Sequence, residues 1–171
     1  MTPPAVNARS EIQLHLLRHA HAGDPLKWSG PDEVRPLSEK GRLQAERLGL
    51  FLAAAGFAPD AILSSPKTRA VETARLVAAP LRLPVRVDDA LADALDIDSL
   101  ERLLTQAGDP ARPMLVGHDP AFSELAAVLV GVDDLPIRKG GLVRIDLTRP
   151  LSPGAGILRW LLPPDLLAAR G

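Results

Sequence analysis

The chain has 171 residues, a formal net charge of −1 at pH 7 and 46% hydrophobic residues, and it contains no cysteine. Its length suits a single domain that buries roughly two-thirds of its unfolded surface, so neither a metal nor a disulfide is needed for folding. The missing cysteines exclude a disulfide framework, a thiolate zinc site and a cysteine nucleophile, and the near-neutral charge predicts no binding to nucleic acid or to an anionic membrane.

Residues 1–10 contain two prolines and no apolar run, so we expect a flexible N-terminal arm and not a signal peptide. No segment approaches the ~20 apolar residues of a membrane span. These features predict a cytoplasmic protein whose folded domain covers residues 11–171.

Beyond the arm, short apolar runs alternate with helical patterns. The first run, residues 12–17, predicts a strand, and residues 19–37 then form a long loop with no helical period. The later patterns predict helices over 38–55, 66–79, 99–106 and 120–130, and strands over 61–63, 84–87, 114–116, 142–147 and 156–162. Ser38 and Ser65 are expected to cap the first two helices, with Pro66 at the first helical position of the second. Strands that alternate with helices predict an α/β fold, a single three-layer α/β/α domain with a mostly parallel sheet.

Ligands of such sheets bind beyond the carboxyl ends of the strands. The polar residues that follow the predicted strand ends are Arg18-His19, Ser64-Ser65 with Arg69, and Gly117-His118. Guanidinium groups are always charged and can bind two phosphoryl oxygens each. The two arginines and two histidines at these positions therefore predict a pocket for a phosphoryl group.

His19 has the chemistry of a nucleophile in such a pocket. A neutral imidazole attacks phosphorus near pH 7, and the positive charges of Arg18 and Arg69 favour its unprotonated form. The attack gives a phosphohistidine, which water hydrolyses in a second step. His118 is expected to donate a hydrogen bond to the oxygens whose charge grows in the transition state.

Four segments resemble motifs of the histidine phosphatase superfamily and stand in the family's order. They are Leu17-Arg18-His19-Ala20, Arg35-Pro36-Leu37-Ser38-Glu39-Lys40-Gly41, Ser64-Ser65-Pro66-Lys67-Thr68-Arg69-Ala70-Val71-Glu72-Thr73-Ala74 and Val116-Gly117-His118-Asp119-Pro120. The run from Gly156 to Pro163 is also similar to the C-termini of the short SixA-type branch, so the resemblance covers residues from about 12 to 163.

The resemblance implies a phosphoglycerate mutase-like fold and a site without a metal or other cofactor. It makes His19 the nucleophile and Arg18, Arg69 and His118 the phosphate-binding residues. Two positions depart from the usual pattern. Ala20 replaces a glycine, which the SixA-type branch accepts. Asp119 replaces the usual asparagine, and three roles are open for it: to point away from the pocket, to accept a hydrogen bond from a backbone amide, or to weaken the affinity for phosphate.

Many members of the superfamily protonate the leaving group with a Glu or Asp that follows the third strand. In the matching segment, 88–96, Asp93 is the best-placed acid, and otherwise these acids cap the next helix or face water. SixA-type members lack an obvious acid, and imidazole leaves phosphorus more readily than an alkoxide does. Asp93 and His118 are only 25 positions apart, which leaves no room for the long covering segments of larger relatives.

We therefore predict a metal-independent phosphatase that dephosphorylates phosphohistidine proteins through an intermediate on His19. One alternative is a phosphatase of small phosphate monoesters, including sugar or nucleotide phosphates, with Asp93 as the acid. Another is a non-catalytic phosphate-binding module that docks phosphorylated partners.

The remaining candidates have simpler interpretations. His15 lies within the first strand and is expected to be packed and hydrogen-bonded. His21 forms a His-x-His pair with His19, as in metal-dependent amidohydrolase barrels, but those barrels need further ligands and usually more than about 200 residues. We therefore expect His21 to line the loop or face solvent. Arg35, beside the loop, suits either contact with a substrate protein or a structural ion pair.

Overall fold

A six-stranded sheet forms the centre of the computed structural model, which describes residues 10–168; residues 1–9 of the predicted arm lie outside the described residues. The strand order is β3-β2-β4-β1-β5-β6. The strands are β1 (Glu11–Arg18), β2 (Ala61–Ser64), β3 (Arg86–Val87), β4 (Pro113–Gly117), β5 (Leu142–Thr148) and β6 (Ile157–Leu162). The first four in chain order run parallel, whereas β5 is antiparallel to β1, and β6 is antiparallel to β5.

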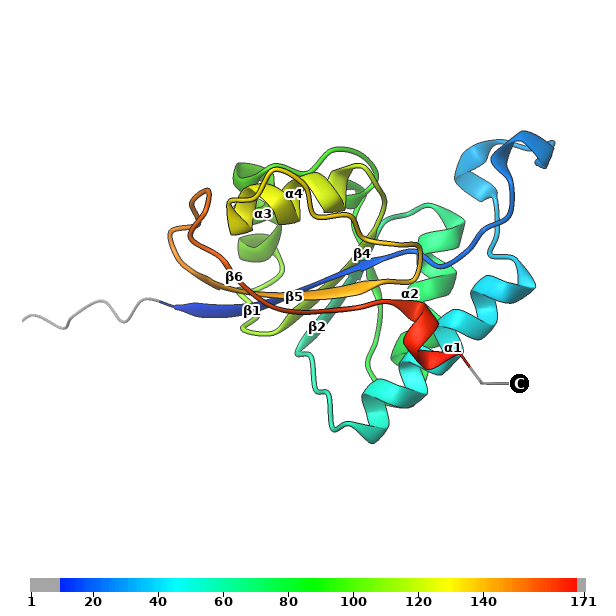
Figure 1. Ribbon diagram of the computed structural model, residues 1–171, viewed down its shortest axis with the longest axis horizontal. Helices are drawn as coiled ribbons and strands as arrows, with labels where there is room; N and C mark the ends of the chain where they lie inside the picture. The colour runs from blue at the N-terminus through cyan, green and yellow to red at the C-terminus, as the bar shows by residue number, and fades with distance from the viewer. Residues whose placement is uncertain (1–9, 169–171) are drawn as a thin grey trace, which may run out of the picture.

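Two pairs of helices cover the two faces of this sheet (Figure 1). The first pair is α1 (Glu39–Ala54) and α2 (Thr68–Leu81), and the second is α3 (Ile97–Gln106) and α4 (Ala121–Val130). Short 3-10 turns lie in the connections, at Pro25–Lys27, Asp32–Val34, Asp89–Leu91 and Pro164–Leu167. The predicted three-layer α/β fold is confirmed. None of the helices between residues 10 and 168 is long and apolar enough to cross a membrane.

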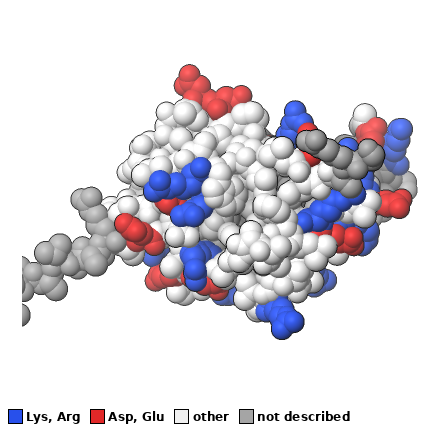
Figure 2. All heavy atoms as spheres, turned by 60° about the horizontal axis from the view of Figure 1, so that its bottom comes forward, with Lys and Arg blue, Asp and Glu red and all other residues white. Residues whose placement is uncertain are grey.

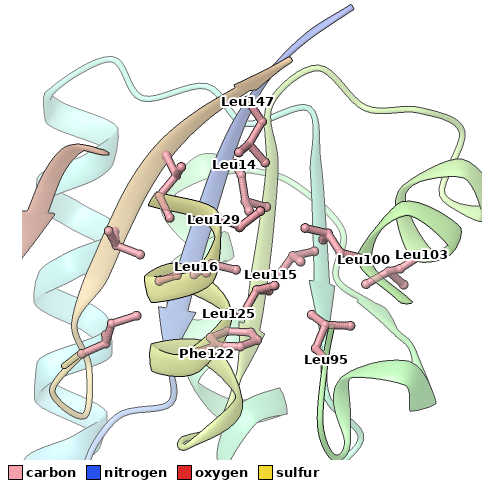
Figure 3. Packing of buried hydrophobic residues seen from close by; sticks show 14 of the residues in the cluster. Leu14, Leu16, Leu95, Leu100, Leu103, Leu115, Phe122, Leu125, Leu129 and Leu147 are labelled. Atoms are coloured by element: carbon pink, nitrogen blue, oxygen red, sulfur yellow. The ribbon is translucent and has the colours of Figure 1, made fainter. Parts of the chain in front are cut away.

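Successive side chains of β1 point to opposite faces of the sheet and therefore join two separate cores. Leu14 and Leu16 join the core under α3 and α4, and Leu17 joins the core under α1 and α2. Figure 3 shows the first core, in which leucines of the sheet meet side chains of both covering helices, among them Leu100, Leu103, Phe122, Leu125 and Leu129. On the face drawn in Figure 2, cations and anions alternate in small groups around a broad uncharged area.

His15 is packed and hydrogen-bonded, as predicted. Its Nδ1 donates to the carbonyl oxygen of Pro113 at 3.2 Å, and its ring meets Phe57 edge-on with centroids 4.7 Å apart. Burial lowers the pKa of His15 to about 4, so the ring is neutral at pH 7. It belongs to the core and not to a ligand site.

Two predicted helix starts were wrong, and each has a physical cause. The helix α2 begins at Thr68, and Ser65 caps no helix, because its amide continues the parallel ladder by donating to the Val116 carbonyl at 2.9 Å. The helix α3 begins at Ile97 because the carboxylate of Asp96 accepts the amide of Ser99 at 2.8 Å. In contrast, Ser38 caps α1 as predicted, through its hydroxyl oxygen and the amide of Gly41.

Gly41 fixes the start of α1 against the loop that follows β1. A Cβ atom at this position would overlap the carbonyl group of His21. The same carbonyl accepts from the Ser38 amide at 3.0 Å, and the amide of His21 donates to Gln44 at 3.0 Å. The Arg-Pro-Leu-Ser-x-x-Gly segment thus anchors the backbone two residues after His19.

Replacing Gly41 with Ala tests this contact. In an unobstructed helix the change stabilises by about 1 kcal/mol, but here the His21 backbone must shift, and we expect a net loss of about 1–3 kcal/mol in the free energy of unfolding. Urea denaturation measures it, with Lys40→Ala, an exposed neighbour in the same helix turn, as the control. An unchanged or raised midpoint for Gly41→Ala would show that the contact is not tight.

Candidate active site

The loop after β1 places His19 at the carboxyl end of the parallel strands. Its amide donates to the Gly117 carbonyl at 2.9 Å, and the amide of Ala20 donates to the Thr73 hydroxyl oxygen at 3.0 Å. Thr73 in turn donates to the Arg69 carbonyl at 2.7 Å, one turn earlier in α2. The backbone of His19 is therefore fixed to both β4 and α2.

The ring of His19 is oriented with one nitrogen free. Its Nδ1 lies 2.8 Å from the carbonyl oxygen of Ala20, and because a carbonyl only accepts, Nδ1 carries the proton. The Nε2 atom then presents a lone pair. Burial lowers the pKa of His19 to about 3, the Ala20 carbonyl opposes this shift, and the neighbouring His118 and the positive charges of Arg69 and Arg18 add to it. The imidazole is neutral near pH 7 and can act as a nucleophile.

His118, at the end of β4, faces His19 with ring centroids 5.2 Å apart. Its Nε2 lies 2.7 Å from the Ser65 hydroxyl oxygen. That oxygen also accepts the amide of Lys67 at 3.3 Å, and Nδ1 of His118 has no hydrogen-bond partner within the described chain. Burial is also the main cause that lowers the pKa of His118 to about 3.

Arg18 is held in place by the segment between α4 and β5 and by Asp119, which precedes α4. Its Nη1 donates to the Ile137 carbonyl at 2.8 Å and lies 3.2 Å from the carboxylate of Asp119. Asp119 also accepts from the amide and the hydroxyl of Ser123, at 3.1 and 2.7 Å. Of the roles left open for Asp119, the structure shows the hydrogen bond to a backbone amide, together with an ion pair to Arg18.

Arg69 enters from the first turn of α2 and is almost fully buried, with 6% of its surface exposed. Its Nη1 donates to the Asp32 carbonyl at 2.7 Å, and its Nη2 to the Asp32 carboxylate at 2.9 Å. The rings of His19 and His118 thus face each other, and the charges of Arg69 and Arg18 act on His19.

Comparisons with known proteins agree with this geometry. The model of the histidine phosphatase superfamily (branch 1) matches residues 14–118, more than half of the chain. The chain belongs to the histidine phosphatase superfamily.

Several known proteins are similar to this chain in sequence or in fold. An uncharacterized chloroplastic protein of Arabidopsis thaliana is 31% identical over 131 residues, which are 70% of this chain and only 59% of the plant protein. Among solved structures, the protein histidine phosphatase SixA complexed with tungstate has a TM-score of 0.79 at 23% identity and covers 92% of this chain and 100% of its own. The alpha-ribazole phosphatase from Shigella flexneri has a TM-score of 0.69 at 20% identity, with coverages of 90% and 97%. These two show the phosphoglycerate mutase-like fold.

The loop between His19 and α1 is held by ion pairs. Arg35 is buried, donates to the Ala22 carbonyl at 2.6 Å and pairs with Asp32 at 2.9 Å. Asp32 therefore bridges Arg35 and Arg69, and these arginines lower the pKa of its carboxyl group. Of the two interpretations for Arg35, the structure shows the ion pair. Sequence patterns did not indicate Asp32, because its contact with Arg69 spans 37 positions.

Lys139 is a second residue that sequence reasoning missed. The amide of its neighbour Gly140 donates to the carbonyls of Arg18 and His19, both at 3.0 Å. Partial burial lowers the pKa of Lys139, and the charges of Arg18, Arg35 and Arg69 lower it further, while Asp24 opposes the shift. Nothing in the Arg-Lys-Gly-Gly run before β5 signals this position, which depends on the antiparallel pairing of β5 with β1.

Asp93 and His21 stand apart from the four central residues. The side chain of Asp93 is 91% exposed and lies 3.9 Å from the Lys67 ammonium, at the far side of a cleft that His118 also lines. Its neighbours Asp88 and Asp96 cap the following turns, as one of the two interpretations expected. The His21 ring lies 2.6 Å from the Ser38 hydroxyl. Among residues 10–168, no group of three or more His, Asp or Glu side chains could hold a metal ion.

The neutral buried histidines predict how stability depends on pH. The folded pKa values of His15, His19 and His118 are about 4, 3 and 3, below the ~6.5 of an unfolded histidine. Their contribution to stability is full above pH 6.5 and is lost as the pH falls. Between pH 6.5 and 5, above the range of most carboxyl groups, each lowers the free energy of unfolding by up to about 1.4 kcal/mol per pH unit.

Urea denaturation at several pH values in this window measures the slope. The control is His118→Gln, which lacks one titrating ring and should show a shallower slope. A free energy of unfolding that stays constant from pH 6.5 to 5 would mean that these histidines titrate in the folded protein as they do in the unfolded chain.

Proposed function

We propose that this protein is a metal-independent phosphatase that removes phosphoryl groups from phosphohistidine in proteins. His19 is the nucleophile, and Arg18, Arg69 and His118 bind the phosphoryl group. The proposal concerns this chain, which spans only part of the length of its plant relative.

The observation that carries the proposal is a set of three buried nitrogen atoms on the residues that we propose bind the phosphoryl group. The Nε atoms of Arg18 and Arg69 and the Nδ1 atom of His118 have no hydrogen-bond partner among residues 10–168. Leaving such a group unpaired costs about 1–3 kcal/mol each. Both Nε atoms are donors, as is Nδ1 in the His118 tautomer whose Nε2 accepts from Ser65. Phosphoryl oxygens are suitable acceptors for these donors, and Nε2 of His19 is suited to attack the phosphorus atom.

The reaction proceeds by two displacements at phosphorus. In the first, the Nε2 lone pair of His19 forms a bond to phosphorus, while the bond between phosphorus and the substrate nitrogen breaks and its electron pair leaves with the imidazole. In the second, water attacks phosphorus, the bond to Nε2 breaks, and phosphate and neutral His19 are released. The guanidinium charges stabilise the negative oxygens in both transition states.

The surroundings of Asp93 favour a nitrogen leaving group over an alkoxide. Its side chain is 91% exposed, and its ion-pair partner is Lys67 at 3.9 Å. An alkoxide needs a proton at the departing atom, whereas a protonated phosphohistidine releases neutral imidazole without one. The structural similarity to SixA, solved with the oxyanion tungstate, also supports this substrate class.

A small phosphate ester is the second candidate substrate. It is supported by the similarity to an alpha-ribazole phosphatase and by the cleft that Asp93 and His118 share. Activity toward an alkyl phosphate that is lost in Asp93→Asn would establish this alternative. A folded protein that binds phosphate without turnover of any substrate would instead be a binding module.

The central test compares a phosphohistidine protein, p-nitrophenyl phosphate and a sugar phosphate, with EDTA present throughout. We expect the phosphohistidine to be hydrolysed and the sugar phosphate to be spared. His19→Ala should abolish turnover, and Arg69→Ala should lower kcat by about 10²–10³. His21→Asn, two positions away, serves as the control and should remain active. Full activity in His19→Ala would disprove the mechanism.

Asp119→Asn tests whether the ion pair between Asp119 and Arg18 competes with phosphate for the guanidinium group. The asparagine side chain keeps an oxygen that can accept from the Ser123 backbone amide, but it lacks the negative charge that lies 3.2 Å from the Arg18 guanidinium. We therefore expect inorganic phosphate to bind more tightly by about 1 kcal/mol, roughly fivefold. Isothermal titration measures the affinity, and Asp119→Ala, which also loses the Ser123 contacts, is the comparison. Equal or weaker binding in Asp119→Asn would show that the carboxylate helps to hold Arg18.

A further inference from the structure

A cleft of about 270 Å³ opens beside His118 and is lined by side chains that include Lys67, Asp93, Asp119 and Glu124. Two further hollows share lining residues with it. One shares Asp93 and Ala94 with it and adds Asp89 and Arg102. The other shares Ala94 and Glu124 and adds Asp96. We call the four exposed carboxylates around these openings, Asp89, Asp93, Asp96 and Glu124, the acidic margin.

Negative charge exceeds positive charge along the acidic margin. The cations that line the same hollows are Lys67, which lies near Asp93, and Arg102, whose Nη2 donates to the Ser99 hydroxyl. Hydrogen bonds from Ser99 lower the pKa of Asp96 and keep it a carboxylate. Asp119 is paired with Arg18. Arg35 and Arg69 are paired with Asp32 of the loop before α1 and line neither the cleft nor the two hollows.

A separate observation shows that this cleft reaches the proposed phosphoryl site. His118 lines the cleft, only 8% of its surface is exposed, and its Nδ1 has no hydrogen-bond partner within the described chain. The cleft therefore leads from a buried donor to the acidic margin. A group attached to a phosphoryl group bound at His118 can leave the site along this path.

We propose that the acidic margin binds a Lys- or Arg-rich segment of the substrate protein that flanks its phosphohistidine. This inference rests on the proposed function and specifies its substrate. Opposite charges across an interface steer association and suppress partners of like charge. The acidic margin thus favours a cationic carrier and disfavours leaving groups that bear additional phosphates.

The test uses two phosphohistidine peptides of equal length, one with lysines and one with glutamates on both sides of the phosphohistidine. At low ionic strength, we expect kcat/KM to be about tenfold higher for the lysine peptide. The preference should shrink in 0.5 M salt, because exposed charges are then screened. Hydrolysis of phosphoramidate, which has no flanking residues, provides the basal activity.

Charge reversal at two exposed positions identifies the surface. In the double variant Asp89→Lys with Glu124→Lys, the preference should disappear or reverse, while phosphoramidate hydrolysis is unchanged. The matched control is Glu46→Lys, an exposed acid on α1, which covers the other face of the sheet. It should retain the wild-type preference.

A binding measurement separates this inference from the proposed function. The variant His19→Ala is titrated with both peptides by fluorescence anisotropy, and tighter salt-sensitive binding of the lysine peptide supports the acidic margin even if the wild type hydrolyses neither peptide. In that case the proposed function would be wrong, but the acidic margin would still be a binding surface for cationic peptides. Equal affinity and equal kcat/KM for the two peptides, or a preference that survives charge reversal, would overturn the inference.

Discussion

Parallel pairing of β1 with β4 places Arg18 opposite Gly117, and this register decides where both site histidines lie. A histidine follows each of these two residues, His19 after Arg18 and His118 after Gly117, and the His19 amide donates to the Gly117 carbonyl. A slip by one residue would turn every β1 side chain to the other face of the sheet. It would exchange the two leucine cores as well, so the packing that stabilises the fold also fixes the distance between the two rings. Gly117 belongs to the same constraint, because a Cβ there would overlap the ring of Phe122 in α4.

Each arginine that we propose binds phosphate is paired with a carboxylate of the chain itself. Asp119 contacts Arg18, and Asp32 contacts Arg69. These pairs make it possible to bury positive charge, since an unpaired buried guanidinium would be very costly. They leave the Nε atoms of both arginines without partners among residues 10–168. The carboxylates thus orient each guanidinium and at the same time reduce the positive potential that a phosphoryl group meets.

The sequence was sufficient to predict the parts of the site that depend on local patterns. Arg18, His19 and His118 follow apolar runs that could only be buried strands, and Arg69 follows a short strand and a Ser-Pro signal, so their shared edge could be inferred from topology. The predicted cap at Ser38 is equally local. Ser65 shows the limit of such reasoning, because a serine before a proline is a typical helix cap. Here the sheet ladder holds its backbone, and its hydroxyl contacts His118 instead.

Contacts between segments that lie far apart in the sequence could not be predicted from it. Asp32 looked like one more polar residue of a long loop, and Lys139 like part of a flexible Gly-containing turn. Their positions depend on how α2 and β5 pack against β1, and no periodicity or spacing encodes that packing. Asp119 was visible as a departure from the family pattern, but its contact with Arg18 depends on Ser123 and Ile137, which only the fold brings together.

The position of the acids connects the chemistry of the site to its substrate. A general acid must hold its proton until the leaving group departs, which burial of the carboxyl group favours. Asp93 is not buried, because its side chain is 91% exposed, and it lies beside Lys67. Its position is better suited to a surface than to proton transfer, and the same holds for the other carboxylates of the acidic margin. A site with the proposed phosphate-binding arginines on one side and exposed carboxylates on the other suits a substrate whose leaving group needs no acid and whose carrier is cationic.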